Sequence, residues 1–168
     1  FSRVRDTAPP GVSVTSTVSD PTRVSPIPMT VSFSEPVSGF DLADVTLFNG
    51  TPSAFSGTGT SYTFNLTPVG QGQVTVSVLA DVAHDSAGNG NTSATPFSTV
   101  YDSEPPSVAM DSTAPEPVNT APIPVVVTFS EEVSGFTVSD VQAGNATVQA
   151  FSGSGSSGWF DAWHGCTP

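Results

Sequence analysis

The sequence repeats itself at an interval of 96 residues, and this repeat constrains the fold more than any other feature. Residues 33–40, Phe-Ser-Glu-Pro-Val-Ser-Gly-Phe, return at 129–136 as Phe-Ser-Glu-Glu-Val-Ser-Gly-Phe. Half of the positions from 1 to 64 are identical to the position 96 residues later, and the alignment needs no gap. Such a period indicates one structural unit that the chain uses more than once.

The phase of the repeat divides the chain. Residues 1–6 align with 97–102, so we expect them to be the closing strand of a preceding repeat or a linker. Residues 7–102 then form a complete repeat, and 103–168 form a partial one. The segment 158–168 diverges, because it begins Gly-Trp-Phe where the first repeat has Tyr-Thr-Phe.

Within the repeat, hydrophobic residues alternate with Ser and Thr. The alternation is clearest in residues 29–33, 62–66 and 74–78. A period of two is typical of a strand with one buried face, and frequent Gly, Pro and Asn leave no window for a helix. Strands are predicted near residues 12–18, 28–34, 44–48, 52–56, 60–66, 73–80 and 95–101. Seven short strands in a repeat of this length favour an all-β fold, an antiparallel β-sandwich.

Composition excludes several classes of protein. With three Lys and Arg residues and a net charge of −12, the chain cannot neutralise a phosphate backbone, so nucleic-acid binding is excluded. No apolar run reaches the length of a membrane-spanning helix, so no membrane insertion is expected. The single cysteine, Cys166, excludes an internal disulfide framework. His84 and His164 are far apart in the sequence and no nucleophile elbow precedes a helix, so we expect no enzymatic activity.

Several motifs in order resemble one known family. They are Phe-Ser-Glu-x-Val-Ser-Gly-Phe at 33–40, Asp-Val at 44, Asn-Gly-Thr at 49, Phe-Ser-Gly at 55, Tyr-Thr-Phe at 62, Val-Thr-Val at 74 and Asp-Ser-Ala-Gly-Asn-Gly-Asn at 85. The chain resembles the bacterial Ig-like repeats of large secreted and cell-surface proteins, including adhesins, over 7–101 and in part over 103–160. The resemblance implies tandem Ig-like antiparallel β-sandwiches, the second incomplete, an extracellular or cell-surface location, and a spacer or adhesion role.

Five oxygen-bearing side chains are expected at one end of the first sandwich. Consecutive strands of such a sandwich run in alternating directions. The start of the first strand, the loop after the second strand and the loop before the last strand therefore lie at the same end of the sandwich. These segments carry Asp6, Glu35, Asp85, Asn89 and Asn91. Carboxylate and amide oxygens suit Ca²⁺, which takes 6–8 such ligands. The alternative is that Asp85 to Asn89 is only a turn, because Asp, Gly and Asn favour turns on backbone grounds.

Two tryptophans form a second candidate site. Trp159 and Trp163 lie in the divergent segment and could stack on a sugar ring of a surface glycan. The alternative is that they complete a core or pack against a neighbouring subunit.

These features lead to three hypotheses on function. The first is a non-enzymatic structural module or spacer that supports surface projection or adhesion, with neighbouring repeats as partners. The second is a subunit of an extracellular filament, in which residues 1–6 of one copy add a strand to the partial repeat of an identical copy. The third is a glycan-binding accessory module. A host protein is a further expected partner.

Overall fold

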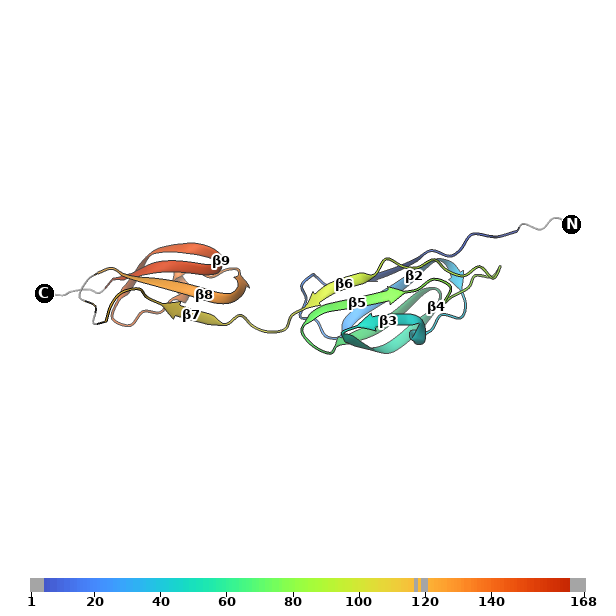
Figure 1. Cartoon of the computed structure of the whole chain (residues 1–168), viewed down its shortest axis with the longest axis horizontal. Coiled ribbons are helices and arrows are strands. Elements are labelled where there is room, and N and C mark those ends of the chain that lie inside the picture. Colours follow the sequence, from blue (N-terminus) through green and yellow to red (C-terminus); the bar gives the residue numbers. More distant parts are fainter. Residues whose placement is uncertain (1–4, 117, 119–120, 164–168) are drawn as a thin grey trace. The chain divides into compact units, whose positions relative to one another are not determined.

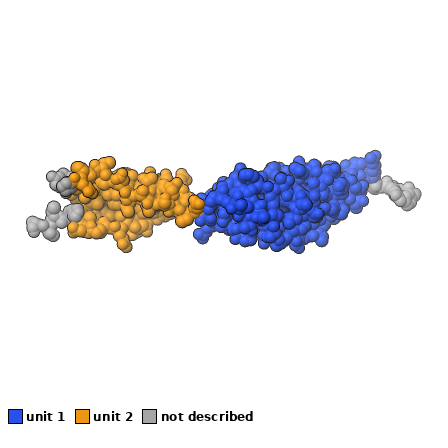
Figure 2. Space-filling model, turned by 60° about the horizontal axis from the view of Figure 1, so that its bottom comes forward, with its two compact units in different colours: residues 1–103 blue, residues 104–168 orange. Residues whose placement is uncertain are grey.

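The chain folds into two compact units, residues 1–103 (unit 1) and 104–168 (unit 2) (Figure 2). The structure, a computed structural model, describes residues 5–116, 118 and 121–163. The expected closing strand at 1–6 falls mainly on residues outside the described ones, so strand addition by this segment stays a prediction. No helix among the described residues is long and apolar enough to cross a membrane.

Unit 1 consists of two antiparallel sheets of three strands each (Figure 1). The first sheet contains β1 (Val12–Ser16), β2 (Ile27–Val37) and β4 (Gly50–Pro68), in the order β1-β2-β4. The second contains β3 (Val45–Phe48), β5 (Gly72–Val78) and β6 (Phe97–Tyr101), in the order β3-β5-β6. A 3₁₀ turn, Leu42–Asp44, precedes β3. The expected all-β architecture is confirmed.

The core of unit 1 lies between the two sheets and is built from alternate residues of the strands. In β2, Met29 and Val31 are at most 1% exposed, and in β5 the same is true of Val74 and Val76. The residues between them are polar, so each strand has one apolar face. This burial is what the period of two in the sequence predicts.

Strand β4 differs from expectation. The sequence predicted separate strands at 52–56 and 60–66, but one irregular strand runs from Gly50 to Pro68. Ala54, Gly57 and Gly59 have positive φ angles of 53°, 132° and 65°. The pairing of β2 with β4 also shifts register between Ser32 and Val37. Irregular residues of this kind let a strand bend without ending, which is why the prediction of a break was wrong.

Four aromatic rings pack together at the bulged end of the first sheet. The ring of Tyr62 lies edge-on to Phe40, with centroids 5.0 Å apart, and edge-on to Phe33 at 5.9 Å. The ring of Tyr62 is also stacked on that of Phe55, with the ring centroids 5.8 Å apart. We call these four residues the aromatic cluster of unit 1. Offset and edge-to-face contacts of this kind stabilise a core beyond the area that they bury.

Unit 2 repeats the first sheet of unit 1. It contains β7 (Val108–Asp111), β8 (Ile123–Val133) and β9 (Thr147–Trp163), in the order β7-β8-β9, with a 3₁₀ turn at Val138–Asp140. The predicted divergence at 158–168 does not interrupt the strand, because residues 158–163 continue β9. Gly158 and Phe160 are buried and Trp159 is exposed, so the alternation required by a half-buried strand is kept.

The inner face of the sheet in unit 2 is more exposed than its counterpart in unit 1. Val14 pairs with Val31 and is 7% exposed, because the second sheet covers it. Met110, at the corresponding position, pairs with Val127 and is 65% exposed. The described part of unit 2 therefore presents a single sheet whose apolar inner face is only partly covered, because Met110 is exposed whereas Val127 and Phe160 are buried.

Candidate metal centre

Three carboxylates from distant parts of unit 1 meet at one end of the sandwich. Asp6 precedes β1, Glu35 lies near the end of β2, and Asp85 lies in the segment between β5 and β6. One carboxylate oxygen of each lies within 4.8 Å of those of the other two. We call these residues the carboxylate group. Glu35 was expected in a loop after the second strand, but β2 extends beyond it to Val37.

Asp85 is held in a tight turn. Its Oδ1 accepts hydrogen bonds from the backbone N–H groups of Ala87 and Asn89, each at 2.8 Å. Its Oδ2 accepts a bond of 2.8 Å from Nδ2 of Asn89. The residue is only 6% exposed. The bond from the Asn89 side chain, helped by the backbone bonds, lowers the pKa of Asp85 below its ordinary value, although burial acts in the opposite direction.

The two asparagines of the predicted site have different roles. The side chain of Asn89 donates to Asp85, so Asn89 lies directly beside the carboxylate group. Oδ1 of Asn91 accepts from the backbone N–H groups of Val82 and Ala83, at 2.9 and 2.8 Å. Nδ2 of Asn91 donates to two backbone carbonyls, those of Leu79 and Thr92, at 2.9 and 2.7 Å. These four bonds use the full capacity of an amide.

Asn91 is therefore a structural residue. It is 2% exposed and holds the backbone of the segment that leads to the turn of Asp85. We leave it out of the candidate site, which consists of the carboxylate group with Asn89 beside it. Residue order alone carries no signal for this role, because the four bonds depend on where two loop segments meet and not on residue type.

The other two carboxylates are more accessible. Asp6 is exposed, and its Oδ1 accepts a bond of 3.0 Å from the backbone N–H of Ala8. Glu35 is half-buried. The structure brings one oxygen of each of the three carboxylates together, and hard, charged oxygens of this kind are the ligands that Ca²⁺ prefers. A neighbouring pair, Asp81 and His84, lies 3.3 Å apart between Oδ1 and Nε2, and sequence reasoning did not detect it.

The two candidate tryptophans lie on β9. Trp159 is 49% exposed and Trp163 is 40% exposed. Trp159 pairs with Val126, which is also exposed. Trp159 and Val126 therefore lie on the outer face of the sheet. Sugar stacking on this face stays a prediction. His164 and Cys166 lie outside the described residues.

The lowered pKa of Asp85 has a consequence for stability at low pH. A carboxylate whose pKa is lower in the folded than in the unfolded state stabilises the fold above its unfolded pKa, about 3.9. This contribution disappears as the pH falls through the folded pKa. We expect Asp85→Asn to melt at a lower temperature than the wild type at pH 7, and the gap to narrow below about pH 4. Thermal denaturation of both proteins from pH 7 to pH 2 measures this difference in Tm. A difference that stays constant with pH would contradict a lowered pKa of Asp85.

The comparison with protein families agrees with the structure. The family model described as bacterial Ig-like domain matches residues 6–100 and again residues 102–167. The two matches follow the 96-residue repeat and coincide closely with unit 1 and unit 2. No curated protein and no solved structure matches the chain. With two matched stretches that together cover most of its length, the chain belongs to the family of bacterial Ig-like domains.

Proposed function

We propose that the chain is a non-enzymatic spacer of a bacterial extracellular repeat protein, which holds another part of that protein away from the cell surface and so supports adhesion. Bacterial Ig-like domains are structural modules of bacterial proteins, and the location and mechanical role are our proposal. The observation that carries it is the very short connection between the two units.

Hydrogen bonds fasten both ends of this connection. Nε2 of Gln71 donates to Oγ of Ser103 at 2.8 Å, and the backbone N–H of Ser103 donates to Oε1 of Gln71 at 3.0 Å. At the other end, the backbone N–H of Ser107 donates to Oγ of Ser130 at 3.0 Å, and that of Ser130 donates to the Ser107 carbonyl at 3.0 Å. Only residues 104–106, Glu-Pro-Pro, lie between the fastened ends.

Two prolines in so short a connection restrict its motion. Each ring fixes φ near −65°, and the residue before each proline is held in an extended conformation. A connection of Gly and Ser would behave as a flexible coil. With stiff connections, each further unit lengthens a chain of repeats by a fixed amount, which is what a spacer requires. The net charge of −12 also opposes association between arrays.

The stiffness can be measured by spin labelling. Ser13 in β1 and Ala109 in β7 are exposed and correspond to one another in the repeat. Labels on Ser13→Cys and Ala109→Cys, in a Cys166→Ser background, report the distance between the units by pulsed electron resonance. We expect a narrow distribution in this chain and a clearly broader one after Pro105→Gly and Pro106→Gly, because both φ restraints are removed.

The matched control keeps the prolines and changes Glu131→Gln in β8, which alters the charge by one unit outside the connection. We expect this variant to give the same narrow distribution. Equal widths with and without the prolines would contradict a spacer that depends on a stiff connection.

A second candidate function is the binding of Ca²⁺ by the carboxylate group. The observation that favours it is that residues separated by 29 and 50 positions bring their carboxylate oxygens within 4.8 Å of one another. Three like charges at this distance repel one another, and a divalent cation would relieve the repulsion. A cation here would join the segment before β1 to β2 and to the turn of Asp85, which would stiffen the end of the unit.

The test is thermal denaturation with millimolar Ca²⁺ or with a chelator. Binding to the folded state alone stabilises it by about 2.7 kcal/mol at a free concentration 100 times the Kd. We expect Ca²⁺ to raise the Tm of the wild type by several degrees and to have no effect on Glu35→Gln. Glu132→Gln, which removes one negative charge from unit 2, should respond like the wild type. A Tm of the wild type that is the same in Ca²⁺ and chelator would rule out the site.

A further inference from the structure

The two units differ at one buried position in a way that changes their interior. Tyr62 pairs with Val31 in unit 1, and Gly158 pairs with Val127 in unit 2, at the same register of the repeat. Both positions are buried. Unit 2 therefore lacks a whole tyrosine side chain where unit 1 has one. This inference does not depend on the spacer role.

The other three members of the aromatic cluster are retained in unit 2. Phe129, Phe136 and Phe151 correspond to Phe33, Phe40 and Phe55. The ring centroids of Phe129 and Phe136 are 5.0 Å apart, against 5.1 Å for the pair in unit 1. The ring centroids of Phe136 and Phe151 are 5.5 Å apart, against 6.0 Å for Phe40 and Phe55 in unit 1. The three rings thus keep their arrangement although the fourth ring is missing.

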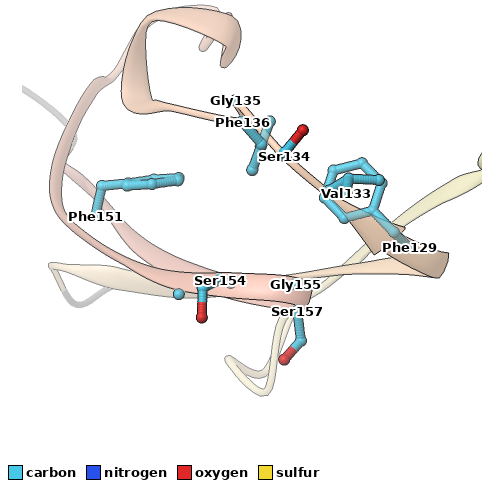
Figure 3. A pocket seen from close by; sticks show the side chains of 11 residues that line it. Phe129, Val133, Ser134, Gly135, Phe136, Phe151, Ser154, Gly155 and Ser157 are labelled. Atoms are coloured by element: carbon cyan, nitrogen blue, oxygen red, sulfur yellow. The ribbon is translucent and has the colours of Figure 1, made fainter. Parts of the chain in front are cut away.

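A pocket occupies the place of the missing ring. Its volume is about 300 Å³, and the three phenylalanines line it together with Val133 and Gly158. Figure 3 shows Phe151 projecting into the pocket from one side and Phe129 and Phe136 lying on the other. A buried apolar cavity of about 150 Å³ is large enough to bind benzene. The pocket therefore has room for one substituted aromatic ring.

We propose that this pocket binds a six-membered aromatic ring of the para-substituted phenol class. The side chain of a tyrosine, which Gly158 lacks, corresponds to one molecule of p-cresol. The contacts of Tyr62 in unit 1 therefore show how such a ring would be bound in unit 2. There the ring of Tyr62 stacks on Phe55 with an interplanar angle of 21° and meets Phe40 edge-on at 72°. A planar ring in unit 2 meets Phe151 and Phe136 in the same two ways.

The polar end of the ligand also has a counterpart. The hydroxyl of Tyr62 donates a long hydrogen bond of 3.5 Å to the backbone carbonyl of Val37. Val133, which lines the pocket, is the corresponding residue of unit 2. The carbonyl of Val133 is thus the acceptor for a phenolic hydroxyl. Since the bond in unit 1 is long, ring contacts contribute most of the affinity and the hydroxyl sets the orientation.

The first experiment titrates the whole 168-residue chain with p-cresol and follows the aromatic signals of the phenylalanines by NMR. We expect saturable shifts, and intermolecular NOEs from the ring of p-cresol to Phe129 and Phe151 in the wild type. Gly158→Tyr should abolish both, because its own ring fills the pocket. A Cβ at Gly158 would lie 3.2 Å from the Ser152 carbonyl oxygen, so the substitution requires only a small shift.

Tyr62→Gly is the matched variant in unit 1. It opens the same space there, so p-cresol should raise the Tm of this variant more than that of the wild type and should bind at two sites. In the wild type, N-acetyl-tyrosinamide separates two sources of the ring. Binding of both compounds indicates that a tyrosine side chain of a partner fits, and binding of p-cresol alone indicates a free small molecule.

Three results would overturn the proposal. One is the absence of saturable shifts with either compound. Another is unchanged p-cresol binding in Gly158→Tyr, because the ligand would then lie elsewhere. The third is equal binding of 4-methylcyclohexanol, whose puckered ring matches p-cresol in size but cannot stack, because the pocket would then select only for apolar volume. The NOEs in the wild type keep the test decisive if a variant fails to fold.

Discussion

The burial of alternate side chains between two sheets is the interaction on which the rest of unit 1 depends. Ile27, Met29 and Val31 from β2 face Val74 and Val76 from β5, and each of the five is at most 1% exposed. Burying one such side chain contributes about 1.5–3 kcal/mol. The connection between the units, the turn of Asp85 and the aromatic cluster are all attached to strands that this core holds in place.

Much of this arrangement could be predicted from the sequence, because alternation and the repeat are properties of residue order. The alternation predicted the strands, and the strand directions predicted that Asp6, Glu35 and Asp85 lie at one end. The unbroken strand β4 could not be predicted, because glycines with positive φ occur both in turns and in bulges. The role of Asn91 also depends on three-dimensional contacts, since its four partners are backbone groups of two loop segments.

The repeat shows how one scaffold can hold different interiors. Strand register and three phenylalanines are the same in both units, yet position 62 carries tyrosine and position 158 carries glycine. The backbone tolerates the exchange because the sheet hydrogen bonds do not involve the side chain. In the spacer that we propose, individual repeats can therefore differ in their interior without loss of the mechanical role, provided that each unit is stable by itself.

Whether each unit is stable by itself is tested most directly by hydrogen exchange on the whole chain carrying Val76→Ala. Val76 is fully buried in unit 1, and its truncation should destabilise the unit by about 2 kcal/mol, which corresponds to about thirtyfold faster exchange of its most protected amides. If each repeat is an autonomous folding unit, amides in β2, β4 and β5 exchange faster and those in β8 and β9 keep their wild-type rates. Equal acceleration in β8 and β9 would contradict the account.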